Sequence, residues 1–230
     1  MANPAGHSVD DYLETIYFLA YPVGEYRPAD GSPAIAARIA ELLGVSRAAS
    51  GEMLKRMEAE GLVTRGPSKE AVLTKAGLKR AKRVVRRHRI VERFLTDYVG
   101  LEPHESHVEA DKIGGTFSDD MVDRMNEKLG FPDRCPHGWL VEPESERKEN
   151  DDLVALADVP AGQSGEIVAL AEHDGDLLQW FYTEGLTPGT QVRVEGHQAA
   201  AGQMTVRVGK REHAIAQKAA GGLFVRIDDA

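Results

Sequence analysis

Apolar residues recur at helical spacing through the first 130 residues and alternate at strand spacing after residue 152. The segment 8–20 begins with Ser8, a suitable N-cap, and then places apolar residues three or four positions apart, which predicts an amphipathic helix. The same spacing predicts further helices over 34–43, 46–60, about 24 residues after Thr74, 103–113 and 118–130.

A tight turn at Gly44-Val45 separates the helices 34–43 and 46–60, as in a helix-turn-helix. Residues 62–74, "LVTRGPSKEAVLT", then form a strand, a turn at 66–69 and a second strand. A two-stranded ribbon directly after a helix-turn-helix predicts a winged helix. The alternative is a three-helix bundle with an incidental hairpin.

Residues 142–152, "EPESERKENDD", contain no large apolar side chain and indicate a linker. Beyond it, short alternating segments and one helical insert, 176–189, predict a small SH3-like β-barrel. The expected strands are 164–170, 190–196, 203–209, 211–217 and 222–227. The predicted architecture is a winged helix-turn-helix domain (1–75), a helical domain of the kind that commonly serves dimerisation (76–141), the linker (142–152) and an SH3-like domain (153–230).

Charge is distributed unevenly along this chain of net charge −9. Residues 1–98 carry 16 Lys and Arg against 12 Asp and Glu, a balance of +4, whereas 99–230 carry 12 against 25, a balance of −13. A basic N-terminal half on an acidic protein indicates that this half contacts a polyanion such as DNA.

Several classes of protein are disfavoured by the sequence. No apolar run is long enough to cross a membrane, and residues 1–11 lack the pattern of a signal peptide. A single cysteine, Cys135, suits the reducing cytoplasm. We find no nucleophile–base set, phosphate loop or zinc-hydrolase motif, so neither an enzyme nor a small organic substrate is expected.

The stretch "RRHRIVERFL" places His88 and Glu92 four residues apart, on one face of a predicted helix. This pair is either half of a metal site or an ordinary surface pair. His107 and Asp111 repeat the spacing on another predicted helix. Imidazole nitrogens and carboxylate oxygens together suit Mn²⁺ and Fe²⁺.

Four motifs in this order, "DDYLETIYFL", "GVSRAASGEMLKRMEAEGLV", "RRHRIVERFL" and "CPHG", together with the SH3-like segment, resemble the iron-dependent repressors of the diphtheria toxin repressor family. That family includes the manganese transport regulators. The resemblance spans nearly the whole chain. It implies a cytoplasmic homodimer that binds palindromic operator DNA when Fe²⁺ or Mn²⁺ is bound, and so represses metal-homeostasis genes.

The resemblance implies an ancillary metal site formed by His88, Glu92 and His107. The family's primary site is altered here, because Gly114 and Gly115 stand where Glu and His are expected. The remaining primary-site candidates, together with one carboxylate expected from the third domain, are Asp11, Glu14, Asp111 and Asp174.

Three alternatives remain open for metal binding. The chain has one rebuilt centre, or only the ancillary site, or no metal response and another effector. The first two are favoured because the donors line up, and the alternative to them is an ordinary solvated acidic face with paired histidines. The carboxylates of the first helix favour Mn²⁺ slightly, and "CPHG" is interpreted as a structural turn rather than a haem ligand. The donors that a rebuilt centre would draw on are Asp11, Glu14, His88, Glu92, His107, Glu109 and Asp111.

The second helix of the helix-turn-helix is the predicted recognition helix. Serine and arginine can read base edges, and alanine can contact a thymine methyl group. The predicted base-reading residues are Ser46, Arg47, Ala48, Ala49 and Glu52. The predicted phosphate contacts are Arg38, Lys55, Arg65 and Lys69, so binding should weaken as salt rises.

Overall fold

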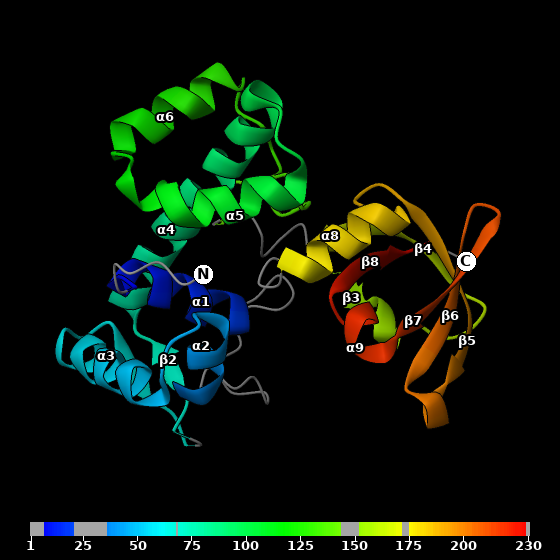
Figure 1. Cartoon of the computed structure of the whole chain (residues 1–230), viewed down its shortest axis with the longest axis horizontal. Coiled ribbons are helices and arrows are strands. Elements are labelled where there is room, and N and C mark those ends of the chain that lie inside the picture. The colour runs from blue at the N-terminus through cyan, green and yellow to red at the C-terminus, as the bar shows by residue number, and fades with distance from the viewer. Residues whose placement is uncertain (1–6, 21–35, 68, 144–151, 172–174, 229–230) are drawn as a thin grey trace.

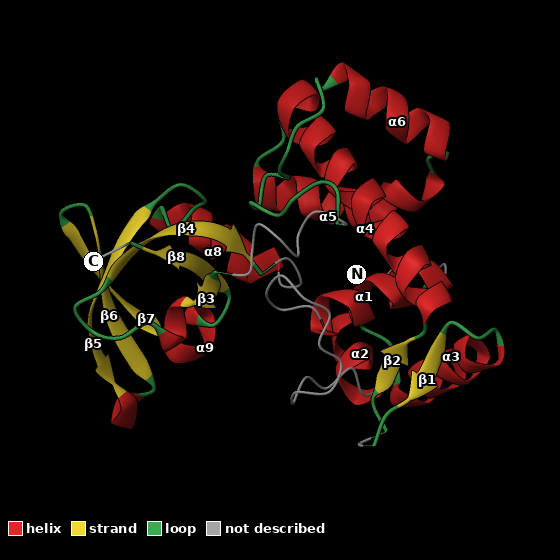
Figure 2. Cartoon of the chain, turned by 180° about the vertical axis from the view of Figure 1, so that it is seen from behind, coloured by secondary structure: helices red, strands yellow, loops and turns green. Residues whose placement is uncertain are grey.

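The computed structural model describes residues 7–20, 36–67, 69–143, 152–171 and 175–228 (Figure 1). A winged N-terminal part and a helical middle part share the long helix α4 (Lys75–Phe94), and a six-stranded sheet lies to one side of both (Figure 2). Among the described residues, no helix is both long and apolar enough to cross a membrane.

The N-terminal part is the predicted winged helix-turn-helix. Strand β1 pairs antiparallel with β2, and Val63 lies opposite Leu73. Ser68, in the predicted turn, and residues 34 and 35, at the start of the predicted second helix, lie outside the described residues. The elements of this part are α1 (Val9–Ala20), α2 (Ala36–Leu42), α3 (Arg47–Ala59), β1 (Val63–Arg65) and β2 (Ala71–Leu73).

Local sequence explains where these elements begin. The Ser46 hydroxyl accepts a hydrogen bond from the Ala49 amide (3.1 Å) and caps α3, as predicted. Thr74 caps α4 in the same way from the Gly77 amide (3.1 Å), and its hydroxyl donates to the Gly61 carbonyl. The ribbon is thereby joined directly to the start of α4.

The helical middle part confirms the predicted long helix after Thr74. Helix α4 continues into a π-helical turn, η1 (Leu95–Val99), and two shorter helices follow at the predicted positions. An apolar core lies between α4, α5 and α6, around Ile90 and Val91. The remaining elements of this part are α5 (Pro103–Ile113), η2 (Gly114–Thr116) and α6 (Asp119–Lys128).

The C-terminal part is an antiparallel sheet with strand order β3-β8-β4-β5-β6-β7. All five predicted strands and the helical insert are present. Strand β3 and helix α9 were not predicted, because three and four residues are too few to show a period. The elements are β3 (Leu153–Ala155), η3 (Leu156–Asp158), β4 (Ser164–Leu170), α8 (Gly175–Glu184), β5 (Gln191–Gln198), η4 (Ala199–Ala201), β6 (Gln203–Val208), β7 (Arg211–Ala216), α9 (Gln217–Ala220) and β8 (Leu223–Ile227).

The turn "CPHG" (135–138) connects the helical middle part to strand β4 of the sheet by hydrogen bonds. The Leu170 amide donates to the His137 carbonyl (3.0 Å), and Trp139 Nε1 donates to the Leu170 carbonyl (2.6 Å). Gly138 has φ +91°, and a Cβ there would lie 1.9 Å from the Val168 carbonyl oxygen. Only glycine therefore allows this close approach of turn and strand.

We expect Gly138→Ala to lower the free energy of unfolding by roughly 1–3 kcal/mol, because it adds a backbone clash to a strained φ. Gly162→Ala is the matched control: its φ is similar (+89°), but a Cβ there meets nothing within 4 Å. Urea unfolding of both variants measures the difference. Equal losses would show that φ alone, and not the contact with β4, requires glycine at 138.

Candidate metal centre

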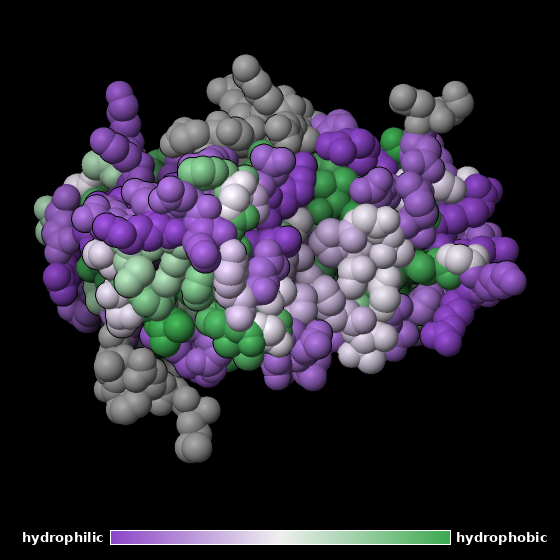
Figure 3. All heavy atoms as spheres, turned by 90° about the horizontal axis from the view of Figure 1, so that it is seen from above, coloured by the Kyte–Doolittle hydropathy of each residue, from purple (hydrophilic) through white to green (hydrophobic). Residues whose placement is uncertain are grey.

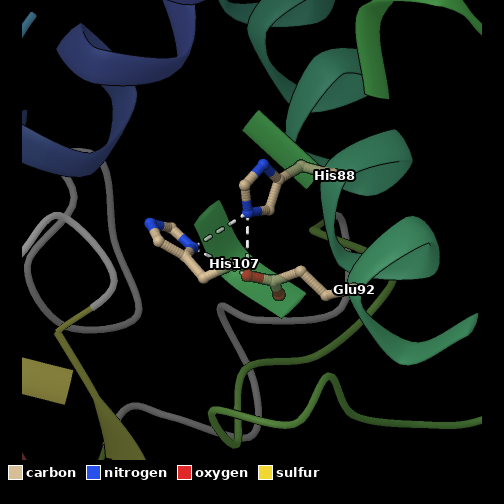
Figure 4. Close-up of side chains that lie close together, drawn as sticks. All are labelled: His88, Glu92 and His107. Atoms are coloured by element: carbon tan, nitrogen blue, oxygen red, sulfur yellow. Dashed lines mark hydrogen bonds and ion pairs between the residues drawn. The ribbon is translucent and has the colours of Figure 1, made fainter. Parts of the chain in front are cut away.

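Three side chains from two helices meet in a buried cluster (Figure 4). His88 and Glu92 lie one turn apart on α4, and His107 reaches them from α5. Glu92 Oε1 lies 2.8 Å from His88 Nε2 and 2.8 Å from His107 Nδ1, and the two nitrogens are 3.1 Å apart. Glu92 is 0% exposed, which excludes an ordinary surface pair.

A second layer of carboxylates surrounds the same histidines. His88 Nδ1 lies 3.3 Å from Glu14 Oε1 on α1 and 3.3 Å from Asp111 Oδ1 on α5. His107 Nε2 lies 3.8 Å from Asp111 Oδ2. Each of these two imidazoles therefore turns one nitrogen toward Glu92 and its other nitrogen toward a carboxylate. This arrangement typically fixes the tautomer of metal-binding histidines.

Burial and neighbouring charges together shift the pKa values of the ionisable groups in this cluster. Burial lowers the pKa of His88, but Glu92 and Glu14 more than offset it, so that this pKa lies well above its usual value. The pKa of His107 is likewise raised, by Glu92 and Asp111 against burial. Burial raises the pKa of Glu14 to about 7. Burial also tends to raise the pKa of Glu92, but the nearby imidazoles of His137 and His88 hold this pKa well below its usual range.

The turn after α6 adds two side chains beside Glu92. His137 is 0% exposed, and its Nδ1 lies 3.3 Å from Glu92 Oε1. The buried thiol of Cys135 belongs to the same group of potential metal-binding atoms. The interpretation of "CPHG" as a turn holds, since the Gly138 amide donates to the Cys135 carbonyl (3.0 Å). Sequence reasoning missed the position of His137, because no helical spacing connects it to His88 or His107.

Other predicted donors lie apart from this cluster. Asp11 accepts a hydrogen bond from the Ser8 amide (2.8 Å) and pairs with His7, so it caps α1. Glu109 pairs with Lys112 (2.6 Å). Asp174 lies outside the described residues. The structure thus brings Glu14, His88, Glu92, His107 and Asp111 together, and it places Asp11 and Glu109 in other contacts.

The donors fit a divalent cation. Several buried polar atoms of the cluster lack a hydrogen-bond partner among the described residues, among them Glu92 Oε2 and both ring nitrogens of His137. Such atoms are costly in an apolar interior unless they are bound. Imidazole and carboxylate donors suit Fe²⁺ and Mn²⁺. The residues present therefore fit a divalent cation, although Gly114 and Gly115 stand where the resemblance predicts Glu and His.

The predicted DNA-contacting residues are mainly exposed. Arg65 and Lys69 are exposed on the ribbon, and Arg65 Nε is 3.5 Å from Glu58 of α3. Arg38 differs, because it pairs with Glu41 (2.8 Å) and lines a cavity that Lys218 of the C-terminal part also lines. The exposed residues at the start and along the outer side of α3 are Ser46, Arg47, Ala48, Ala49, Glu52 and Lys55.

Comparison with known proteins identifies the class to which this fold and site belong. The model of the iron-dependent repressor N-terminal DNA-binding domain matches residues 6–71, and that of the iron-dependent repressor metal-binding and dimerisation domain matches 74–139. The FeoA domain model matches 154–227. The chain belongs to the iron-dependent repressor family and is a metal-responsive, DNA-binding transcriptional repressor.

Individual relatives agree with this assignment. The chain is 34% identical over 206 residues to the iron-dependent repressor IdeR of Mycobacterium tuberculosis, covering 84% of this chain and 86% of that one. It is 30% identical over 227 residues to the diphtheria toxin repressor of Corynebacterium efficiens, covering 92% and 95%. A manganese-dependent transcriptional repressor in complex with manganese has a TM-score of 0.83 at 26% identity, covering 95% and 99%.

Proposed function

We propose that Fe²⁺ or Mn²⁺ bound by His88, Glu92 and His107 switches this protein to a form that binds operator DNA as a homodimer. The observation that carries this proposal is the meeting of three buried donors from α4 and α5 around one oxygen, Glu92 Oε1. When bound, the cation supplies a positive charge that replaces the protons of the histidines. We infer a regulator of the cytoplasm, where the DNA is, with no catalytic role.

Glu14 connects this centre to the DNA-binding part. Its helix, α1, packs in the winged core through Tyr12, Ile16 and Tyr17. With Nε2 of His88 engaged, its proton stays on Nδ1, which faces the Glu14 carboxylate at 3.3 Å. His88 then donates to Glu14 and holds α1 against α4. The position of the winged part relative to the helical part would thereby depend on the state of His88.

The apolar surface of the helical part supports dimerisation. Phe94 and Tyr98 stack with their ring centroids 5.2 Å apart near the end of α4. Figure 3 looks onto this end of the molecule and shows green apolar surface among purple polar surface. Two-fold symmetry of this part would place two recognition helices on a palindromic operator. The exposed large apolar residues among the described residues of the helical part are Tyr98, Val99, Val108, Met121 and Phe131.

The direct test is fluorescence anisotropy of the purified protein on DNA from upstream of its own gene. Titrations are run in chelator, in Mn²⁺ and, without oxygen, in Fe²⁺. We expect the affinity for DNA to rise at least about tenfold with metal, within the usual range of allosteric coupling. Equal affinities in all three conditions would mean that metal response is lost and that another effector acts on the winged helix.

Arg65→Ala should weaken binding to every DNA sequence by a similar factor, because an exposed ribbon arginine is placed to contact phosphate. The slope of log affinity against log salt should also become shallower by about 1. Anisotropy on the operator and on a scrambled duplex, each at several salt concentrations, measures both effects. Loss confined to the operator would instead assign Arg65 to base reading.

Metal affinity should rise with pH. Metal binding at these imidazoles competes with protons, and the raised pKa values of His88 and His107 mean that both hold a proton more tightly than free histidine does. The affinity then rises about tenfold per pH unit for each proton displaced, and the dependence ends above the raised pKa values. Calorimetry between about pH 6 and 8, in buffers of different ionisation enthalpy, counts the protons released. A pH-independent affinity would contradict the assigned donors.

A further inference from the structure

A cavity of about 870 Å³ lies between the winged part and the C-terminal part. Helices α1 and α2 line one side of it, and α8, α9 and β8 line the other. Its volume is in the usual range for sites that bind small molecules. Among the described residues, none of the proposed metal donors lines this cavity, so the proposed function leaves it without a role.

The apolar lining of the cavity combines aromatic rings with very small side chains. The winged and helical parts contribute the rings of Tyr17, Phe18 and Trp139, and β8 adds that of Phe224. Rings beside small side chains leave room for a flat apolar group, which can pack against the ring faces and edges. The small residues that the C-terminal part contributes are Ala171, Gly175, Ala216, Ala219, Gly221 and Gly222.

Charged side chains give the cavity a net positive charge. Its lining includes three cations, Arg38, Arg89 and Lys218, and two carboxylates, Glu41 and Asp176. The pKa of Glu41 is lowered by the hydrogen bond it accepts from Arg38 and, from the other side of the cavity, by Lys218. Lys218 of α9 is thus close enough to α2 to act on its charges. The excess of one positive charge favours a ligand that carries one negative charge.

The cavity adjoins both the helix-turn-helix and the metal centre. Arg38 and Glu41 belong to α2, the first helix of the helix-turn-helix. Phe18 lies edge-on to the ring of His88, with centroids 6.4 Å apart. A molecule that packs against Phe18 and α2 would therefore contact residues next to both known functions of the chain. Any effect of such a molecule on metal or DNA binding must be reciprocal.

We propose that this cavity binds a small organic anion with a flat apolar body, which acts as a second effector beside the metal. The inference goes beyond the proposed function, because no metal donor takes part in it. The ligand would connect the winged part to the C-terminal part. It would also hold Arg38, a predicted phosphate contact, at the cavity and away from DNA. Bound ligand would therefore oppose operator binding.

The test uses two fluorescent probes, anilinonaphthalene sulfonate, a flat organic anion, and phenylnaphthylamine, the same ring system without the charge. Ala216 is exposed and lines the cavity, so Ala216→Phe places a ring where the ligand would lie. We expect this variant to weaken binding of both probes by at least about tenfold, because a packed volume cannot hold two groups. Lys218→Gln should weaken binding of the sulfonate by about two- to fivefold and leave the uncharged probe unaffected.

The matched control is Ala214→Phe. Ala214 lies two residues from Ala216 on the same face of β7 and is also exposed, but it does not line the cavity. This variant should bind both probes as the unmodified protein does. All titrations are made in chelator, so that the result does not depend on the metal centre. Unchanged binding by Ala216→Phe, or an equal loss in Ala214→Phe, would overturn the proposed site.

The effector role is tested on DNA. Operator carrying a red fluorophore, whose emission is separate from that of the probe, is titrated with the protein in Mn²⁺, with and without saturating anilinonaphthalene sulfonate. We expect the probe to lower operator affinity by at least about fivefold in the unmodified protein, within the usual range of allosteric coupling, and to have no effect in Ala216→Phe. Unchanged operator affinity in the unmodified protein would overturn the effector role.

Discussion

Replacing Glu92 with alanine should reduce metal affinity by about 100-fold or more and abolish the gain in operator affinity that metal produces. Glu92 Oε1 is the atom around which the cluster is built, within 2.8 Å of both His88 and His107. Without the Glu92 carboxylate, the pKa of His88 should fall, because Glu92 is one of the groups that raise it. Equilibrium dialysis with Mn²⁺ and anisotropy with and without metal measure the two effects.

Glu109→Ala is the matched control for this experiment. Glu109 is also a carboxylate of the helical part, but it pairs with Lys112 at the surface. It should leave metal affinity within about twofold, as expected for an exposed pair. If the Glu92→Ala variant bound Mn²⁺ as tightly as the unchanged protein, the centre would have to lie elsewhere, and the group Glu14, His88 and Asp111 would be the next candidate.

Replacing Glu14 with alanine should separate metal binding from DNA binding. The residue lies on α1 and faces His88 Nδ1, the nitrogen that points away from Glu92. The metal-dependent gain in DNA affinity, in the range of about 5- to 150-fold for coupled sites, should fall to nearly none. Metal affinity should fall much less, because the donors around Glu92 remain. Glu14→Gln keeps an oxygen that accepts from Nδ1 and should retain part of the coupling.

The control for the Glu14 variants is Asp10→Ala, which removes another contact between α1 and α4, the ion pair with Arg80 (2.7 Å). That pair is partly exposed, so its loss should change the coupling little. Coupling is reciprocal, so DNA should also stop increasing metal affinity in Glu14→Ala. Full metal activation of DNA binding by Glu14→Ala would exclude α1 as the connection and direct attention to the C-terminal domain.

Sequence patterns predicted most of this fold because its signals are local. The N-caps Ser46 and Thr74, the glycine turn at Gly44 and the alternating strands are decided by neighbours within a few residues. The elements that sequence reasoning missed, β3 and α9, have three and four residues. Their conformation is imposed by pairing with β8 and by packing on the sheet, and a single-segment pattern cannot contain that information.

For the candidate site, too, the sequence predicted the local features and the tertiary structure decided the contacts between distant segments. The sequence by itself determined that His88 and Glu92 share a helix face, and resemblance added His107. Only the tertiary structure decided that Glu92 is fully buried and that Glu14 faces His88 while Asp11 caps its own helix. It also decided that His137 approaches Glu92 from a turn far away in the chain. The physical reason is that burial and contact across domains depend on how the helices and the sheet pack, whereas a spacing of four residues is fixed by the helix alone.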